Sequence, residues 1–137
     1  MIDPANVPEV GEGELLARYI LFSKHIRQDR TLKPDAFIPH PYLDLSVTRH
    51  LSASEGELWA VGRAVAEAQG RTLYGRGDVR CSVFTRQRLA VVPKPLDGNP
   101  NHADVSGWPR EKPEQKMIAL EIAAAAKFEP VDASSSG

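Results

Sequence analysis

The fold is decided first by the stretch Tyr42-Leu43-Asp44-Leu45-Ser46-Val47-Thr48-Arg49, in which apolar and polar side chains alternate. A period of two puts successive side chains on opposite faces of an extended chain, so this stretch is predicted to be a half-buried strand. A Ser54–Glu57 capping box follows, and apolar residues then recur at helical spacing over residues 58–65, before Gly70. The sequence therefore predicts a strand followed by a capped helix.

The segment before this unit is predicted to be a helix as well. Between Glu14 and Gln28, apolar residues such as Leu16 and Ile20 recur at helical spacing, and basic residues occupy the other side. The pattern stops before Pro34, because the residue that precedes a proline avoids helical backbone angles. An amphipathic helix over residues 14–28 is the expected result.

The segment after the unit is predicted to hold a turn, a short helix, two strands and a last helix. Residues 74–78 are rich in glycine and predict a tight turn, with Asp78 as the cap of the short helix. Residues 89–92 predict a strand, and residues 102–108 are expected to return antiparallel to it. The last helix, over residues 113–126, is apolar almost all round, so we expect it to be the most buried helix.

Together these elements predict an α+β fold, in which a small sheet of about three strands packs with roughly three to four helices. The length of 137 residues is typical of a single domain. Residues 13–130 are expected to form that globular domain. Acidic residues and prolines over residues 1–12 predict a flexible N-terminal arm, and the small polar residues of 131–137 predict a disordered tail.

Composition excludes several classes of protein. The 17 basic and 18 acidic residues give a net charge of -1, so the chain is no polyelectrolyte. Its single cysteine, Cys81, cannot form an internal disulfide and is expected to pack inside a reduced, cytoplasmic protein. No apolar run nears the roughly 18 residues of a membrane span, so we expect no membrane partner. The four histidines are scattered, so neither a metal site nor a cofactor is predicted.

The clearest local charge lies between Arg71 and Lys94, where six basic residues accompany one acidic residue, Asp78. Arginine suits phosphate and carboxylate groups because its planar fork donates two parallel hydrogen bonds. The predicted ligand-binding residues are Arg49, Arg71, Arg76 and Arg80. The alternative is a solvated basic face with no ligand.

A second candidate site is the segment around His102 and Asp104. They are two positions apart on an extended chain, which places both side chains on one face, where the carboxylate could orient the imidazole as a general base. The alternative is a turn in which polar side chains only satisfy the backbone. The polar face formed by Asp44, Ser46 and Thr48, with His50 beyond it, is assigned to solvent exposure.

These features favour a small intracellular binding or interaction module that recognises a protein partner or a small phosphate-bearing anion through residues 71–94. Nucleic acid is considered but not favoured, since aromatic residues are only 7% of the chain. The alternative is a small transferase or hydrolase that acts on a phosphorylated or nucleotide substrate with an Arg/His/Asp site. A homodimer is left open.

Overall fold

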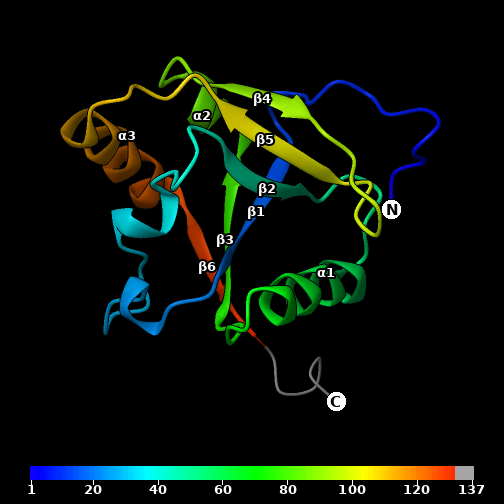
Figure 1. The fold of residues 1–137 in the computed structure, drawn as a ribbon, viewed down its shortest axis with the longest axis horizontal. Helices are drawn as coiled ribbons and strands as arrows, with labels where there is room; N and C mark the ends of the chain where they lie inside the picture. Colours follow the sequence, from blue (N-terminus) through cyan, green and yellow to red (C-terminus); the bar gives the residue numbers. More distant parts are fainter. Residues whose placement is uncertain (132–137) are drawn as a thin grey trace.

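The computed structural model describes residues 1–131, which form one antiparallel sheet of six strands in the order β4-β5-β2-β1-β3-β6 (Figure 1). The strands are β1 (Leu15–Ile20), β2 (Leu45–Arg49), β3 (Gly75–Arg80), β4 (Ala90–Pro93), β5 (His102–Ser106) and β6 (Lys127–Pro130). The helices are α1 (Glu55–Ala68), α2 (Cys81–Thr85) and α3 (Lys112–Ala125), with 3-10 turns η1 (Ser23–His25) and η2 (Pro34–Phe37). The predicted sheet of about three strands with three to four helices is therefore wrong: the sheet is twice that size, and it dominates the fold.

The first reason for this error is β1, which was predicted to be part of a helix. Leu16 and Ile20 are four residues apart, and that separation puts two side chains on the same side of both a helix and a strand. The choice is made by neighbours, since β1 lies between β2 and β3 and pairs with both. The helix predicted over residues 14–28 is therefore replaced by a central strand and the short turn η1.

The second reason is β3, where the glycines predicted a tight turn. Gly77 lies inside this strand, and the packing around it explains why the residue there is a glycine. A Cβ at this position would stand 2.7 Å from Leu32 and 3.0 Å from Phe37, so a side chain has no room. Asp78 belongs to the same strand and caps no helix. Strand β6, which pairs with β3 at the sheet edge, was not anticipated at all.

Other predicted elements are confirmed. The Ser54 hydroxyl accepts from the Glu57 N–H and the Glu57 carboxylate accepts from the Ser54 N–H, so α1 begins at the expected capping box. Strands β4 and β5 pair antiparallel as predicted. Helix α3 also forms, but one side of it faces outward, with Met117 70% and Leu120 47% exposed.

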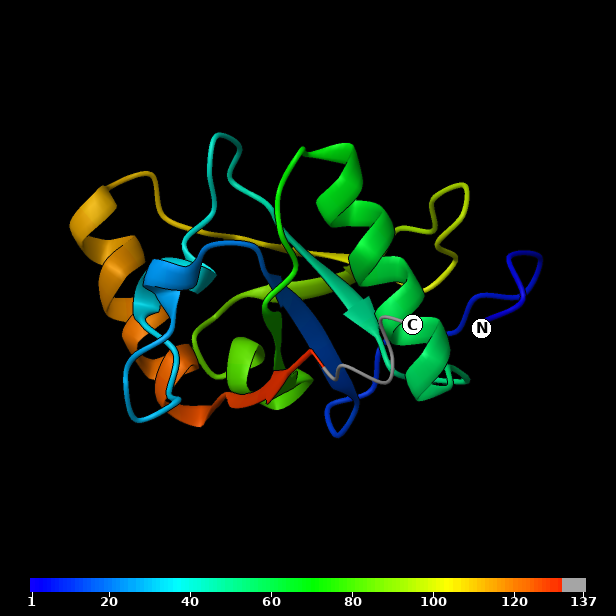
Figure 2. The same cartoon turned by 90° about the horizontal axis from the view of Figure 1, so that it is seen from below.

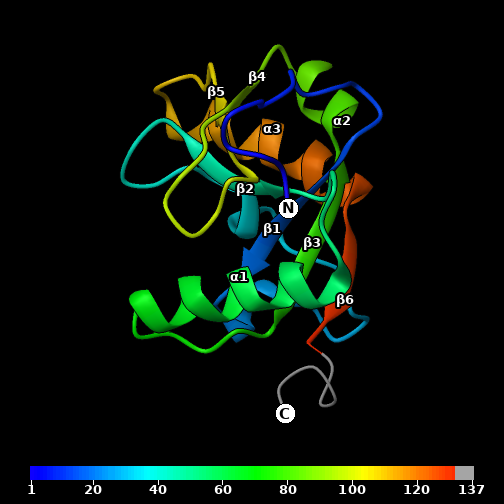
Figure 3. The same ribbon diagram turned by 90° about the vertical axis from the view of Figure 1, so that its right-hand side faces the viewer.

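The sheet separates an apolar face from a polar one. Leu16, Val47 and Val105 lie in the hydrophobic core beneath α3 and η2, together with Phe37 and Ile122. Helix α1 crosses the opposite face, in front of β1 and β3 in Figure 3 and away from α2 and α3 in Figure 2. There the Tyr19 hydroxyl donates to the Leu58 carbonyl oxygen.

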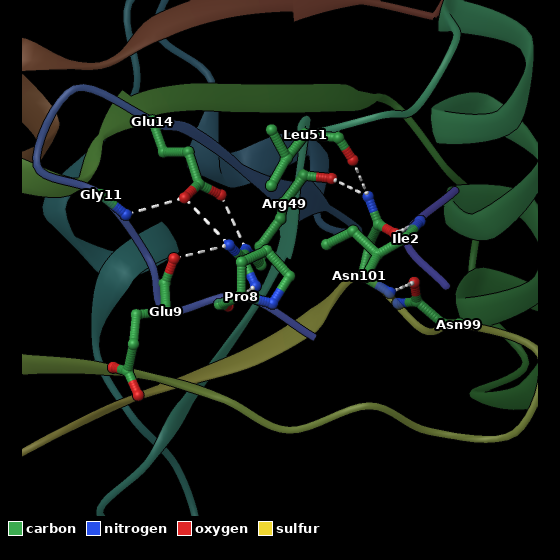
Figure 4. A network of polar contacts seen from close by, with 9 residues as sticks. All are labelled: Ile2, Pro8, Glu9, Gly11, Glu14, Arg49, Leu51, Asn99 and Asn101. Atoms are coloured by element: carbon green, nitrogen blue, oxygen red, sulfur yellow. Dashed lines mark hydrogen bonds and ion pairs between the residues drawn. The ribbon is translucent and has the colours of Figure 1, made fainter. Parts of the chain in front are cut away.

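The N-terminal segment, expected to be a flexible arm over residues 1–12, packs against the sheet (Figure 4). The fully buried Arg49 donates to Glu14 Oε1 at 2.7 Å and to the carbonyl oxygens of Pro8 at 2.7 Å and Glu9 at 3.1 Å. Ile2 is buried, and its N–H donates to Asn101 Oδ1 at 2.8 Å.

At the C-terminal end, the predicted tail lies outside the described residues apart from Val131. Within residues 1–131, no helix has the length and apolarity to span a membrane.

Candidate functional site

Polar side chains gather on the face of the sheet that α1 crosses. Residues directly opposite each other in neighbouring strands project from the same face. Tyr19 lies opposite Arg76, and Ala17 lies opposite both Thr48 and Asp78. The register therefore places these side chains on this face: Tyr19, Ser46, Thr48, Arg76, Asp78, Arg80, His102, Asp104, Lys127 and Glu129.

A pocket of about 650 Å³ opens at the β3 and β6 end of this face. Its lining combines β3 with the chain after β2, the first residue of α1, and helix α2. The polar side chains that line it include His50, Arg76, Asp78, Arg80, Ser82 and Arg86. The other charged side chains in the lining are Glu55, Lys127 and Glu129. The pocket is therefore lined by four basic and three acidic side chains, in addition to His50.

The centre of the pocket lining is Asp78, which holds two partners. His50 Nε2 lies 2.9 Å from Asp78 Oδ1, and Arg76 Nε donates to the same carboxylate at 3.0 and 3.2 Å. The side chain of Asp78 is 9% exposed and that of His50 is 18% exposed, so both are withdrawn from bulk water. A carboxylate can only accept hydrogen bonds, so Nε2 carries a proton and Nδ1 keeps its lone pair in the neutral ring. Among residues 1–131, no partner occupies Nδ1.

Arg76 is fixed from three sides. Its guanidinium stacks over the Trp59 ring at 4.6 Å, and its Nη2 donates to Glu55 Oε1 at 3.0 Å. Nη1 lies 2.9 Å from Glu55 Oε2 but makes no hydrogen bond within the described chain. Burial alone would lower the pKa of Arg76, but its hydrogen bonds to Glu55 and Asp78 and the charges of those carboxylates raise the pKa above its usual value. Arg76 therefore stays charged, and it holds Asp78 in place.

Tyr19 closes the side of this cluster beneath α1. Its ring packs against Gly62, where an added Cβ would stand 2.7 Å from the ring. Burial raises the pKa of Tyr19 to about 12, although the side chain of Thr48 and the charge of Arg76 act in the opposite direction and Asp78 adds to the rise. The phenol is thus held neutral beside the charged cluster.

Two cations of the pocket have no acidic partner in residues 1–131. Arg80 Nη1 donates to the Gly13 carbonyl oxygen at 2.7 Å, and both Arg80 and Arg86 are exposed. Lys127, by contrast, pairs with Glu129 at 3.1 Å. Within the part of the chain that the structure describes, neither Arg80 nor Arg86 lies within ion-pair distance of a carboxylate. Their charge is therefore available to a ligand.

The structure brings together two of the four arginines that the sequence indicated. Arg76 and Arg80 line the pocket, whereas Arg49 and Arg71 do not. Arg49 is buried with the N-terminal segment, where Nε, Nη1 and Nη2 all donate hydrogen bonds. Arg71 stacks over Phe22 at 4.1 Å.

His102 and Asp104 share one face, as their spacing predicted, but they lie outside the pocket lining. His102 Nδ1 donates to the Lys94 carbonyl oxygen at 2.9 Å, and Nε2 lies 3.6 Å from Asp104 Oδ1. Lys94 Nζ pairs with Asp104 at 3.2 Å. These three residues form a closed cluster across β4 and β5.

Sequence reasoning missed His50 and Glu55. His50 continues the alternation of Ser46 and Thr48, and that signal was available, but the polar face was assigned to solvent. Its partner Asp78 was not recognised because Asp78 was predicted to cap a helix.

Cys81, which was expected to pack inside the protein, is 2% exposed, and burial raises the pKa of its thiol.

No cluster of three or more His, Cys, Asp or Glu side chains in residues 1–131 is arranged to hold a metal ion. Comparison with protein-family models, with curated proteins and with solved structures finds no match to this chain. The fold and site by themselves define a single-sheet antiparallel protein whose polar face carries a histidine–aspartate–arginine pocket.

Proposed function

We propose that the protein binds a small phosphate-bearing anion in the pocket beside His50. The observation that carries this proposal is the pair Arg80 and Arg86, which line one pocket without an acidic partner in the described chain. Guanidinium groups bind phosphate oxygens through charge-assisted hydrogen bonds that are about twice as strong as neutral ones. Two such groups at one opening favour an anion over a neutral ligand.

The dimensions of the pocket support a small ligand. Its volume of about 650 Å³ falls within the range of roughly 300–1,000 Å³ that is typical of small-molecule sites. Trp59 is buried under Arg76, so it is not available as a platform on which a succession of bases could stack. A ligand of one or two nucleotide units fits these features better than a long polynucleotide.

A protein partner would use a different surface. The most exposed large apolar side chains include Tyr42 and Met117, which lie outside the pocket lining.

A cytoplasmic location is part of the same proposal. The free, buried thiol of Cys81 supports it, because cysteines in the cytoplasm are kept reduced.

The test is binding of uridine 3′-monophosphate by calorimetry, with the double variant Arg80→Ala/Arg86→Ala. We expect affinity to fall at least about tenfold, because each lost charged hydrogen bond costs more than about 1.4 kcal/mol. The matched control is Arg71→Ala/Arg110→Ala, which removes the same charge from outside the pocket lining. Equal losses in both variants would show diffuse attraction by net charge, and the proposal would then fail.

A further inference from the structure

We infer that His50 and the arginines beside it cleave a ribonucleotide phosphodiester, with the neighbouring 2′-hydroxyl as the nucleophile. This inference rests on the proposed function, since it gives the bound phosphate a substrate class and the pocket an activity. It starts from two features that lie in one cavity: an oriented histidine and two cations that have no acidic partner among residues 1–131.

The state of the His50 imidazole is set by its hydrogen bond to Asp78. Nε2 is committed to Asp78 at 2.9 Å, and Asp78 is held in turn by Arg76 at 3.0 Å. The ring is therefore fixed in orientation and tautomer by a carboxylate, as in catalytic histidines generally. Nδ1 is the nitrogen left to exchange a proton with a bound ligand. His102, by contrast, donates from Nδ1 to a backbone carbonyl oxygen and lies outside the pocket lining.

The nucleophile is the 2′-hydroxyl of the substrate itself. This hydroxyl is on the ribose carbon next to the carbon that carries the phosphate, so its proximity lowers the barrier to attack. What the protein must then supply first is a group that accepts the hydroxyl proton. His50 Nδ1 takes the 2′-hydroxyl proton while the O2′–P bond forms. The P–O5′ bond breaks, and the leaving O5′ takes a proton from water, to which the imidazolium later returns its own. The products are a 2′,3′-cyclic phosphate and a 5′-hydroxyl, and nothing is oxidised or reduced.

Cleavage also requires that negative charge at the phosphate be stabilised. Attack on a phosphodiester adds negative charge to the non-bridging oxygens, and positioned cations stabilise that charge most when it develops. Arg80 and Arg86 lie in the same lining as His50 and can serve this role. Arg76 cannot do so fully, because two carboxylates already engage it.

The experiment uses the full chain with uridylyl-3′,5′-adenosine and its 2′-deoxy analogue, which has no internal nucleophile. We expect release of uridine 2′,3′-cyclic phosphate from the ribonucleotide and none from the deoxy analogue. His50→Gln should reduce the rate at least about a hundredfold, which is the usual contribution of an acid–base group. The exposed His40→Gln is the matched histidine control, and it should leave the rate within about twofold. Variants purified in parallel exclude a contaminating ribonuclease.

Binding of the deoxy analogue separates the two proposals. If it binds in an Arg80- and Arg86-dependent manner and the ribonucleotide stays intact, the cleavage inference is overturned and the binding proposal stands. Absence of binding to the wild-type chain overturns both. Cleavage of the deoxy analogue would identify an external nucleophile, such as Ser82 in the same lining, and would also overturn the inference. His50→Gln should have a lower thermal midpoint, because it loses the hydrogen bond to Asp78, but it should be fully folded at the assay temperature and keep its affinity for the deoxy analogue. A loss of rate in that variant is then not a loss of fold.

Discussion

Two histidine–aspartate pairs lie on the same face of the sheet and differ in how they are assembled. His102 and Asp104 are neighbours in one strand, and Lys94 from the adjacent connection engages both of them. His50 and Asp78 are 28 residues apart in sequence and meet across the central strand β1. The local pair is closed by its surroundings, whereas the distant pair lines a pocket and leaves one ring nitrogen without a partner in the described chain. Spacing in the sequence identified the local pair, but it did not reveal that the distant pair lines the pocket.

The largest expected difference between the pairs is in stability. Asp78→Ala removes a buried carboxylate from Arg76, whose side chain is only 4% exposed, so we expect a loss of about 3 kcal/mol in the free energy of unfolding. Asp104→Ala should cost less than about 1 kcal/mol, because its partner Lys94 is 62% exposed. Urea denaturation monitored by tryptophan fluorescence measures both. Similar losses would mean that the two pairs are equivalent structural contacts.

The direct contact within each pair can be isolated by double-mutant cycles. For His50→Gln and Asp78→Asn we expect a coupling energy of about 2 kcal/mol, since the hydrogen bond is short, charged and largely shielded from water. For His102→Gln and Asp104→Asn the coupling should be at most about 0.5 kcal/mol, because the ring nitrogen and carboxylate are 3.6 Å apart. A larger coupling in the second cycle would reverse the comparison.

The pH dependence of stability tests how α1 shields the pocket end of the face. The pKa of Tyr19 in the folded protein is about 12, against 10.0 for an unperturbed tyrosine. Its contribution is therefore complete below pH 10 and is lost as the pH rises towards 12, by up to about 1.4 kcal/mol per pH unit. Relative to Tyr19→Phe, the wild-type free energy of unfolding should fall over this range. Parallel profiles for the two proteins would contradict the burial of this phenol.

The smallest expected effect is at the closed pair. Lys94→Ala removes an exposed ammonium group from Asp104, and surface ion pairs of this kind contribute little. We expect the free energy of unfolding to change by less than about 0.5 kcal/mol, as measured in the same urea titration. A substantially larger loss would show that the β4–β5 cluster holds this end of the sheet together.

The fold was predictable where local signals have one meaning. The Ser54–Glu57 capping box is a strong signature of a helix start, and the valine-rich strand β4 with its antiparallel return β5 also formed as expected. Leu16 and Ile20 gave an ambiguous signal, since a separation of four residues suits either a helix face or a strand face. Gly77 misled because its local preference for turns was outweighed by the close approach of Phe37.

The site was predictable only in part for the same reason. Arg76 and Arg80 were chosen by charge and chemistry, and both line the pocket. Arg49 was chosen on the same grounds, but its position in β2 directs it towards Glu14 and the N-terminal segment. Residue type therefore identified groups suited to an anion, and burial separated those that are available from one that is consumed by the fold.

The amino-acid sequence alone determined the capped helix α1, the pairing of β4 with β5 and the excess of arginine in residues 71–94. These depend on contacts over short stretches of chain, so neighbouring residues contain the required information. Only the tertiary structure decided that Asp78 would meet His50, because that contact needs β1 to be inserted between β2 and β3. The hydrogen bonds that stabilise β1 come from β2 and β3, which are distant in the sequence, so the local sequence of β1 does not predict them.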